Sequence, residues 1–378
     1  MSQLDHDARV TQFCHSTGHK SLKFLMSVGE FCQINRPLQV LLTKLTQHTK
    51  WLRQWPSASC LYTPLSHPCL IRILIKDTVA MTQAIRMQFS ATPGTLSQYA
   101  RALLARGAGQ RDIQMPDIEA LLVGVKARPE RVAAYASVCG FRTQTSLLPL
   151  TYPHVLAFPL HMELMLHKQF PLALMGLVHI RNEITQYRAI RQEEKLDIRC
   201  HFSGSTKTDK GLEFDIHTEI TIGGEKVWES VSTNLARMRS TEAKGAKKER
   251  PPLASFATVE RWTLHSNLGR RYARVSGDSN PIHLYALSAK LFGFKSHIAH
   301  GMWSKARTAA ALQPLLHSDA CRLTTEFKLP VFLPSAVELH YNLHETLSSD
   351  QPNNAGIDFE LRSVRGEKVH MKGRIEKI

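Results

Sequence analysis

The chain has 378 residues, 43% of them hydrophobic, which is enough for two or three domains. No apolar run approaches the roughly 18 residues of a membrane-spanning helix, and the N-terminus lacks the basic-then-apolar plan of a signal peptide, so we expect a cytoplasmic protein without membrane contact. Seven cysteines without framework spacing agree with reduced thiols there. The net charge of +16 is spread along the chain without a nucleic-acid-binding motif, so it favours another kind of anionic ligand.

Residues 1–92 show little hydrophobic periodicity. Four of the seven cysteines lie here, and their spacing fits no paired CxxC zinc site: Cys14, Cys32, Cys60 and Cys69. We therefore expect a poorly defined N-terminal extension and no metal site. A natural start at Met81 or Met87, which would leave residues 1–80 outside the protein, stays open.

Helix start and stop signals appear after residue 92. Residues 96–106 predict a helix, and residues 129–139 predict another, with a proline in its first position and Gly140 as its stop. Residues 118–125 fit either a helix or a strand. Residues 155–168 predict a further helix, which follows Tyr152-Pro153-His154.

The chain then repeats itself. Gly-Glu-Lys-Val occurs at 224–227 and again at 366–369, an offset of 142 positions, and the segments 186–199 and 327–340 match in pattern at an offset of 141. Apolar residues at every second position precede each Gly-Glu-Lys-Val, as is typical of a strand that enters a hairpin turn: Phe214, Ile216 and Ile220, then Ile357, Phe359 and Leu361. We expect two similar halves, residues 93–238 and 257–378.

Residues 239–256 join these halves. The segment begins with RSTEAKGAKKERPP, which is charged and ends in two prolines. This composition is typical of a flexible linker. Its lysines could contact nucleic acid, but a solvated connector fits the composition better.

The second half carries a dense turn, Ser276-Gly277-Asp278-Ser279-Asn280-Pro281-Ile282-His283. Its proline suits the first position of a helix over 281–292, and Asn280 or Ser279 suits the N-cap. His283 then falls in the first helical turn, where the positive end of the helix dipole keeps the imidazole neutral and basic. Because Asp278 lies just before the same helix, the turn holds a pair of groups able to transfer protons.

A second helix start follows at His300-Gly301. Residues 302–312 predict a helix that ends before Pro314. The N–H of Gly301 has no partner within such a helix, so it can bind an anion or a developing negative charge.

The run 272–303 closely resembles the signature of the MaoC-like dehydratases, the (R)-specific enoyl-thioester hydratases of the hot-dog fold. The signature is an SGD-x-NP-[IL]-H turn, then GF and I-x-HGM. It covers about a tenth of the chain, and no chemical position departs from it. The matching residues are Gly277, Asp278, Asn280, Pro281, His283, Gly293, Phe294, Ile298, His300, Gly301 and Met302.

This resemblance implies a role for each matched residue. Asp278 and His283 would form the hydratase dyad, Asn280 would brace the loop, and the N–H of Gly301 would bind the thioester oxygen. Substrate contacts are expected from Ser276, Gly277 and His300.

The resemblance and the repeat together predict an α+β, tandem hot-dog protein, with a long helix wrapped by an antiparallel sheet in each half. In the first half no acid accompanies His154 or His161. We therefore expect both to be ordinary helix residues and residues 93–238 to be a degenerate, non-catalytic half that shapes an acyl pocket. Residues 257–378 would be the catalytic half.

The predicted function is the reversible hydration of a trans-2-enoyl thioester to an (R)-3-hydroxyacyl thioester, without a cofactor. The substrate would be linked to CoA or to an acyl carrier protein, both of them anionic, and a homodimer is one possible assembly. Two alternatives stay open. One is a dehydratase of 3-hydroxyacyl carrier proteins, and the other is a non-catalytic acyl-thioester binding module.

Overall fold

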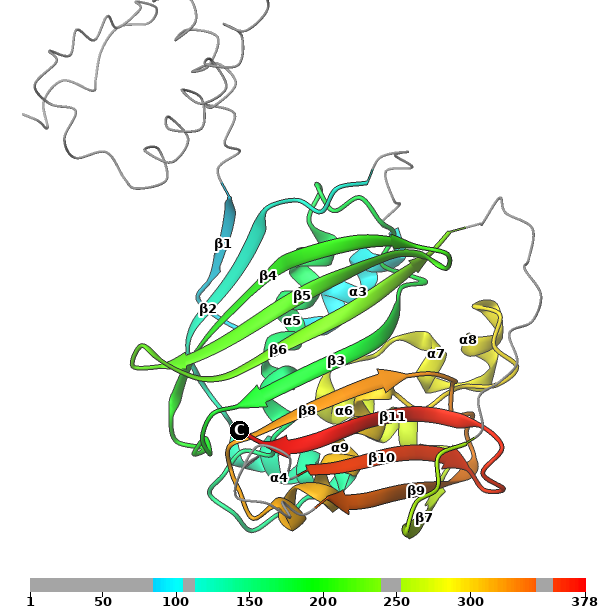
Figure 1. The fold of residues 1–378 in the computed structure, drawn as a ribbon. Helices are drawn as coiled ribbons and strands as arrows, with labels where there is room; N and C mark the ends of the chain where they lie inside the picture. The colour runs from blue at the N-terminus through cyan, green and yellow to red at the C-terminus, as the bar shows by residue number, and fades with distance from the viewer. Residues whose placement is uncertain (1–83, 105–112, 239–252, 345–355) are drawn as a thin grey trace, which may run out of the picture. The chain divides into compact units, whose positions relative to one another are not determined.

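The computed structural model describes residues 84–104, 113–238, 253–344 and 356–378 (Figure 1). The predicted extension up to residue 83 and the predicted linker, apart from its last residues, lie outside the described residues, so these two assignments stay predictions. Among the helices that the structure describes, none is both long and apolar enough to cross a membrane.

Eleven strands of the described residues form one sheet in the order β1-β2-β4-β5-β6-β3-β8-β11-β10-β9-β7 (Figure 1). All neighbouring strands are antiparallel except β1 and β2. The first six strands are β1 (Ile85–Phe89), β2 (Ile118–Lys126), β3 (Val178–Gln186), β4 (Lys195–Thr208), β5 (Gly211–Ile222) and β6 (Glu225–Arg237). The others are β7 (Thr258–Leu264), β8 (Cys321–Phe327), β9 (Ser335–His344), β10 (Gly356–Ser363) and β11 (Val369–Lys377).

Two details of the sheet bear on the sequence predictions. The sequence left helix and strand as alternatives for residues 118–125, and the structure shows that they belong to strand β2. Strand β1 lies within the segment 1–92 that the sequence assigned to the extension, and it pairs with β2 along its whole length. A chain that started at Met87 would therefore lack the first two residues of β1.

Both copies of Gly-Glu-Lys-Val lie at hairpin turns, as predicted. The first connects β5 to β6, and the second connects β10 to β11. The alternating apolar residues before each turn are buried: Phe214, Ile216, Ile220, Ile357, Phe359 and Leu361. Strands β3 and β8, which belong to the two matching segments, pair with each other in the middle of the sheet.

The helices are α3 (Thr95–Leu104), α4 (Pro129–Cys139), α5 (Tyr152–Leu166), α6 (Leu268–Ser276), α7 (Pro281–Leu284), α8 (Ala286–Leu291) and α9 (Gly301–Leu312), with a 3-10 turn over Gln313–Leu316. Helix α5 packs against β2, β4 and β5, and α9 packs against β8 and β11. Figure 1 shows both helices on the same side of the sheet, α5 behind β4–β6 and α9 behind β8–β11. Each long helix thus covers a different group of strands on the same face of the sheet.

The single helix predicted over 281–292 is wrong. Tyr285 has extended backbone angles, φ −141° and ψ 151°, and separates α7 from α8. Side chains stabilise this break, because Arg270 donates to the Leu284 carbonyl at 2.7 Å and Ser288 donates to the Pro281 carbonyl at 2.7 Å. His283 therefore lies on a helix of one turn, and its imidazole is held by neighbouring elements.

Candidate active site

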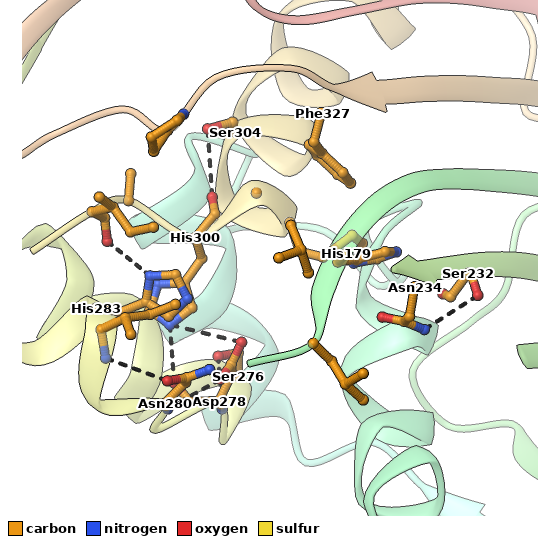
Figure 2. Close-up of a pocket in the computed structure, with 18 of the residues that line it drawn as sticks. His179, Ser232, Asn234, Ser276, Asp278, Asn280, His283, His300, Ser304 and Phe327 are labelled. Atoms are coloured by element: carbon orange, nitrogen blue, oxygen red, sulfur yellow. Dashed lines mark hydrogen bonds and ion pairs between the residues drawn. The ribbon is translucent and has the colours of Figure 1, made fainter. Parts of the chain in front are cut away.

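A cavity of about 680 Å³ lies between the two long helices and the middle of the sheet. It is lined by residues of α3, α5, β3, α7 and α9 and by the loops that follow α6 and β8. Most of the predicted site residues lie on one wall of it (Figure 2). The exception is Gly277, which does not line the cavity and lies against Thr95.

The turn that carries Asp278 is set by its two ends. Gly277 ends α6 with φ +78°, a left-handed conformation that suits glycine. The Asn280 side chain caps α7 by accepting a hydrogen bond from the Ile282 N–H at 3.3 Å, as the sequence predicted. Asp278 and His283 are thereby brought to the same wall of the cavity.

His283 has a defined tautomer. Its Nδ1–H donates to the Ile298 carbonyl at 2.8 Å, so Nε2 carries the lone pair. Burial lowers the pKa of His283, an effect that the carboxylate of Asp278 and the Ile298 carbonyl only partly oppose. The neutral imidazole predicted from the sequence is thus supported, but the cause is burial rather than a long helix dipole.

Asp278 is held as a carboxylate. Burial by itself would raise its pKa, but the neighbouring His300 and His283, the Tyr99 hydroxyl and the Asn280 N–H outweigh burial, and the pKa lies below its ordinary value. The Tyr99 hydroxyl donates to Oδ1 at 2.5 Å, and the Asn280 N–H donates to the same oxygen at 3.2 Å. The other oxygen, Oδ2, lies 3.9 Å from Nε2 of His300.

His300 supports the loop more than it faces a substrate. Its Nε2–H donates to the backbone carbonyl of Asp278 at 3.0 Å, and its ring stacks on that of His283 with centroids 3.7 Å apart. Burial lowers the pKa of His300 to about 3, so the ring is neutral. Ser276, the other predicted substrate contact, accepts a hydrogen bond from the Asp278 N–H at 3.2 Å through its Oγ.

Gly301 begins α9 beside this wall. A Cβ at this position would lie 3.1 Å from the ring of Phe327, so the close approach favours glycine. The Gly301 N–H belongs to the first turn, where no carbonyl of the same helix can accept from it. A donor is therefore available at the start of a helix that lines the cavity.

Two residues of the site were not predicted. Tyr99 lies 179 positions before Asp278, and nothing in the sequence signals their hydrogen bond. Gly269 on α6 allows close approach to α7, because a Cβ there would lie 1.9 Å from the His283 carbonyl oxygen. The Tyr99 hydroxyl thus helps to position Asp278, and the absence of a side chain at Gly269 allows the close packing that positions His283.

The described residues contain one group that could hold a metal ion. Asp278, His283 and His300 each offer one ligand atom, and these atoms lie within 4.8 Å of one another. An ion bound there would occupy the carboxylate and the Nε2 lone pair that a water molecule would otherwise use. Metal binding and water activation by the same pair therefore compete.

The arrangement has the parts that addition of water to a conjugated thioester requires. A carboxylate and a neutral imidazole can hold a water molecule, and an N–H at a helix start can stabilise an enolate oxygen. The residues that supply these three groups line one cavity, and Figure 2 shows Asp278 and His283 on the same wall of it.

The comparisons with known proteins agree with this geometry. A family model described as "MaoC like domain" matches residues 247–356. The chain is 37% identical over 268 residues to 3-hydroxyacyl-thioester dehydratase X of Mycobacterium tuberculosis, covering 70% of this chain and 91% of that protein. The chain belongs to the MaoC-like dehydratase family.

Solved structures support the same fold. The crystal structure of HtdX from M. tuberculosis has a TM-score of 0.58 and 33% identity, covering 69% of this chain and 100% of that one. A MaoC-like dehydratase from Phytophthora capsici has a TM-score of 0.54 at 18% identity, covering 69% of this chain and 95% of that one. The fold is the α+β, hot-dog fold of these dehydratases.

Proposed function

We propose that this protein is a hydro-lyase that catalyses the reversible hydration of a trans-2-enoyl thioester to an (R)-3-hydroxyacyl thioester. The observation that carries the proposal is that Asp278, His283 and Gly301, the first residue of α9, line the same cavity. The name of the M. tuberculosis relative, a 3-hydroxyacyl-thioester dehydratase, supports the reaction class.

In the proposed reaction one water molecule is held by the Asp278 carboxylate and Nε2 of His283. The pair removes a proton from the water as its oxygen attacks C3 of the substrate. The electrons of the double bond move to the thioester oxygen, which accepts a hydrogen bond from the Gly301 N–H. The pair then returns the proton to C2 on the same face, so water adds in the syn sense.

Each group has the form that this role requires. The lowered pKa of Asp278 keeps it anionic, and the lowered pKa of His283 keeps its lone pair free at neutral pH. No step needs a metal or an organic cofactor, and Asn280 supports the loop by capping α7. Ser276 and His300 line the cavity, and both also hold the turn that carries Asp278.

The tandem hot-dog arrangement is part of the proposal. The equivalent strands β3 and β8, the two Gly-Glu-Lys-Val hairpins and the two long helices α5 and α9 support a duplication of one unit. Residues 93–238 would shape the acyl pocket, and residues 257–378 would supply the catalytic groups. The proposal also includes a cytoplasmic location and an anionic carrier, CoA or an acyl carrier protein. Exposed Arg237 at the cavity supports the anionic carrier.

The direct test is a hydration assay with the purified full chain. Trans-2-enoyl-CoAs of graded length and a carrier-protein thioester should lose their conjugated absorbance, with an (R)-3-hydroxyacyl product and no effect of a metal chelator. A folded protein that binds these thioesters without turning them over would instead support the non-catalytic binding module. Turnover of the carrier-protein thioester alone would support the carrier-protein dehydratase.

A further inference from the structure

Three histidines of the first half line the same cavity as Asp278 and His283. His154 and His161 lie on α5 and His179 lies on β3. The ring centroids of His154 and His161 are 5.3 Å apart, and those of His154 and His179 are 6.2 Å apart. From the sequence we expected His154 and His161 to be ordinary helix residues. In the structure they form, with His179, a polar cluster on the cavity wall.

This histidine cluster has unused hydrogen-bonding capacity. His161 pairs with the Thr218 hydroxyl through Nε2 at 2.7 Å. In contrast, Nδ1 of His154 and Nε2 of His179 are buried and have no hydrogen-bond partner among the described residues. Buried polar atoms are almost always paired, so two unpaired ones on residues that line a cavity point to a ligand that pairs with them.

The cluster is neutral, which limits what it can bind. Burial lowers the pKa of His161 to about 3 and that of His179 to about 4, and it lowers the pKa of His154 well below its ordinary value. A neutral imidazole offers one donor and one acceptor, whereas a carboxylate or phosphate would call for a cation. The suitable ligand group is therefore an uncharged oxygen, such as a hydroxyl or an oxo group.

The cluster also lies close to the reacting centre. The ring of His179 is 5.2 Å from that of Phe327, centroid to centroid, and the Phe327 ring is the group that a Cβ at Gly301 would meet. Figure 2 shows His179 across the cavity from His300 and Asp278. A chain that extends from a thioester at Gly301 would therefore meet the cluster after passing Phe327.

The burial of the histidine cluster indicates which part of the substrate reaches it. His154 and His161 are 6% and 4% exposed, and the cavity continues along α5 between apolar side chains, Phe158, Met162 and Met165. A charged nucleotide or a carrier protein cannot enter a buried apolar region, so it must stay outside this part of the cavity. The acyl tail is the part that reaches the histidines.

We propose that the histidine cluster selects acyl chains that carry a second oxygen, a hydroxyl or an oxo group further from the thioester than C3, which His154 and His179 bind by hydrogen bonds. This inference rests on the proposed function and names its substrate class. A plain alkyl tail would leave the same imidazole nitrogens unpaired. A site built to bind an oxygen discriminates strongly against the analogue that lacks it.

The test compares trans-2-enoyl-CoAs of equal length, either unsubstituted or carrying one hydroxyl group at successive carbons of the tail. For at least one position we expect the wild-type protein to show a kcat/KM about tenfold or more above that of the unsubstituted chain. His154→Leu and His179→Leu should reduce that ratio by about tenfold. His201→Leu, a histidine on β4 that does not line the cavity, is the matched control and should retain the ratio.

Each outcome has a separate meaning. Equal kcat/KM for substituted and unsubstituted chains at every position would overturn the inference from the wild-type protein alone, even if the leucine variants do not fold. A preference that survives both leucine variants would also overturn it. In either case hydration of the unsubstituted thioester would leave the proposed function intact, whereas no hydration of any of the thioesters would contradict the proposed function itself.

Discussion

Replacing Asp278 with Asn is expected to lower kcat for hydration by at least about 100-fold, the usual contribution of a general acid–base group. Asparagine keeps the size of the side chain and can still pair with the Tyr99 hydroxyl, but it cannot take a proton from water. His283→Gln should have an effect of similar size, because the amide offers no basic lone pair in place of Nε2. The substrate KM should change far less than kcat.

Matched controls separate this loss from damage to the fold. Asp209→Asn changes an exposed acid in the turn between β4 and β5, and His265→Gln changes an exposed histidine that does not line the cavity. Both controls should retain kcat. If the Asp278 and His283 variants are folded by circular dichroism and turn over at a near wild-type rate, the dyad assignment is wrong.

Lys305→Met is expected to lower the free energy of unfolding by about 3 kcal/mol, the scale of leaving several buried hydrogen-bond acceptors without their donor. Lys305 is fully buried on α9. Its Nζ donates to the Asn182 carbonyl at 2.7 Å, the Asn182 Oδ1 at 2.5 Å and the Leu323 carbonyl at 2.9 Å. Methionine keeps the apolar stem of the side chain but leaves these oxygens without that donor.

The same substitution should affect catalysis, because Lys305 lies one turn after Gly301 and ties α9 to both β3 and β8. Chemical denaturation gives the stability change, and kcat measured well below the melting temperature gives the effect on the site. Lys290→Met, at an exposed position on α8, is the control and should change neither. A loss of less than about 0.5 kcal/mol, the range of ordinary surface substitutions, would show that the Lys305 side chain does not hold α9 to β3 and β8.

The features that the sequence could predict are local ones. The Asn280 cap, the glycine stop at 140 and the two Gly-Glu-Lys-Val hairpins each depend on a few neighbouring residues and on a period-two pattern. The turn that carries Asp278 and His283 could be predicted for the same reason, because the two residues lie within six positions of each other. Short-range preferences are enough to specify such elements.

The missed features depend on contacts between distant segments. Arg270 stabilises the break at Tyr285 that divides the predicted helix 281–292. Tyr99 reaches Asp278 from α3, and the two halves meet through β3 and β8. His154 lies at the cavity because of the way α5 packs against the sheet. The helical periodicity of the sequence does not predict this packing.

The most direct test of the mechanism is the stereochemistry of hydration in deuterium oxide. One water held by Asp278 and His283 on one face should deliver both the hydroxyl at C3 and the deuteron at C2 to that face. We predict a single deuterium at C2, syn to the new (R)-hydroxyl group, as read by nuclear magnetic resonance of the product. Anti addition, or a product without deuterium at C2, would contradict catalysis of both proton transfers by this one pair.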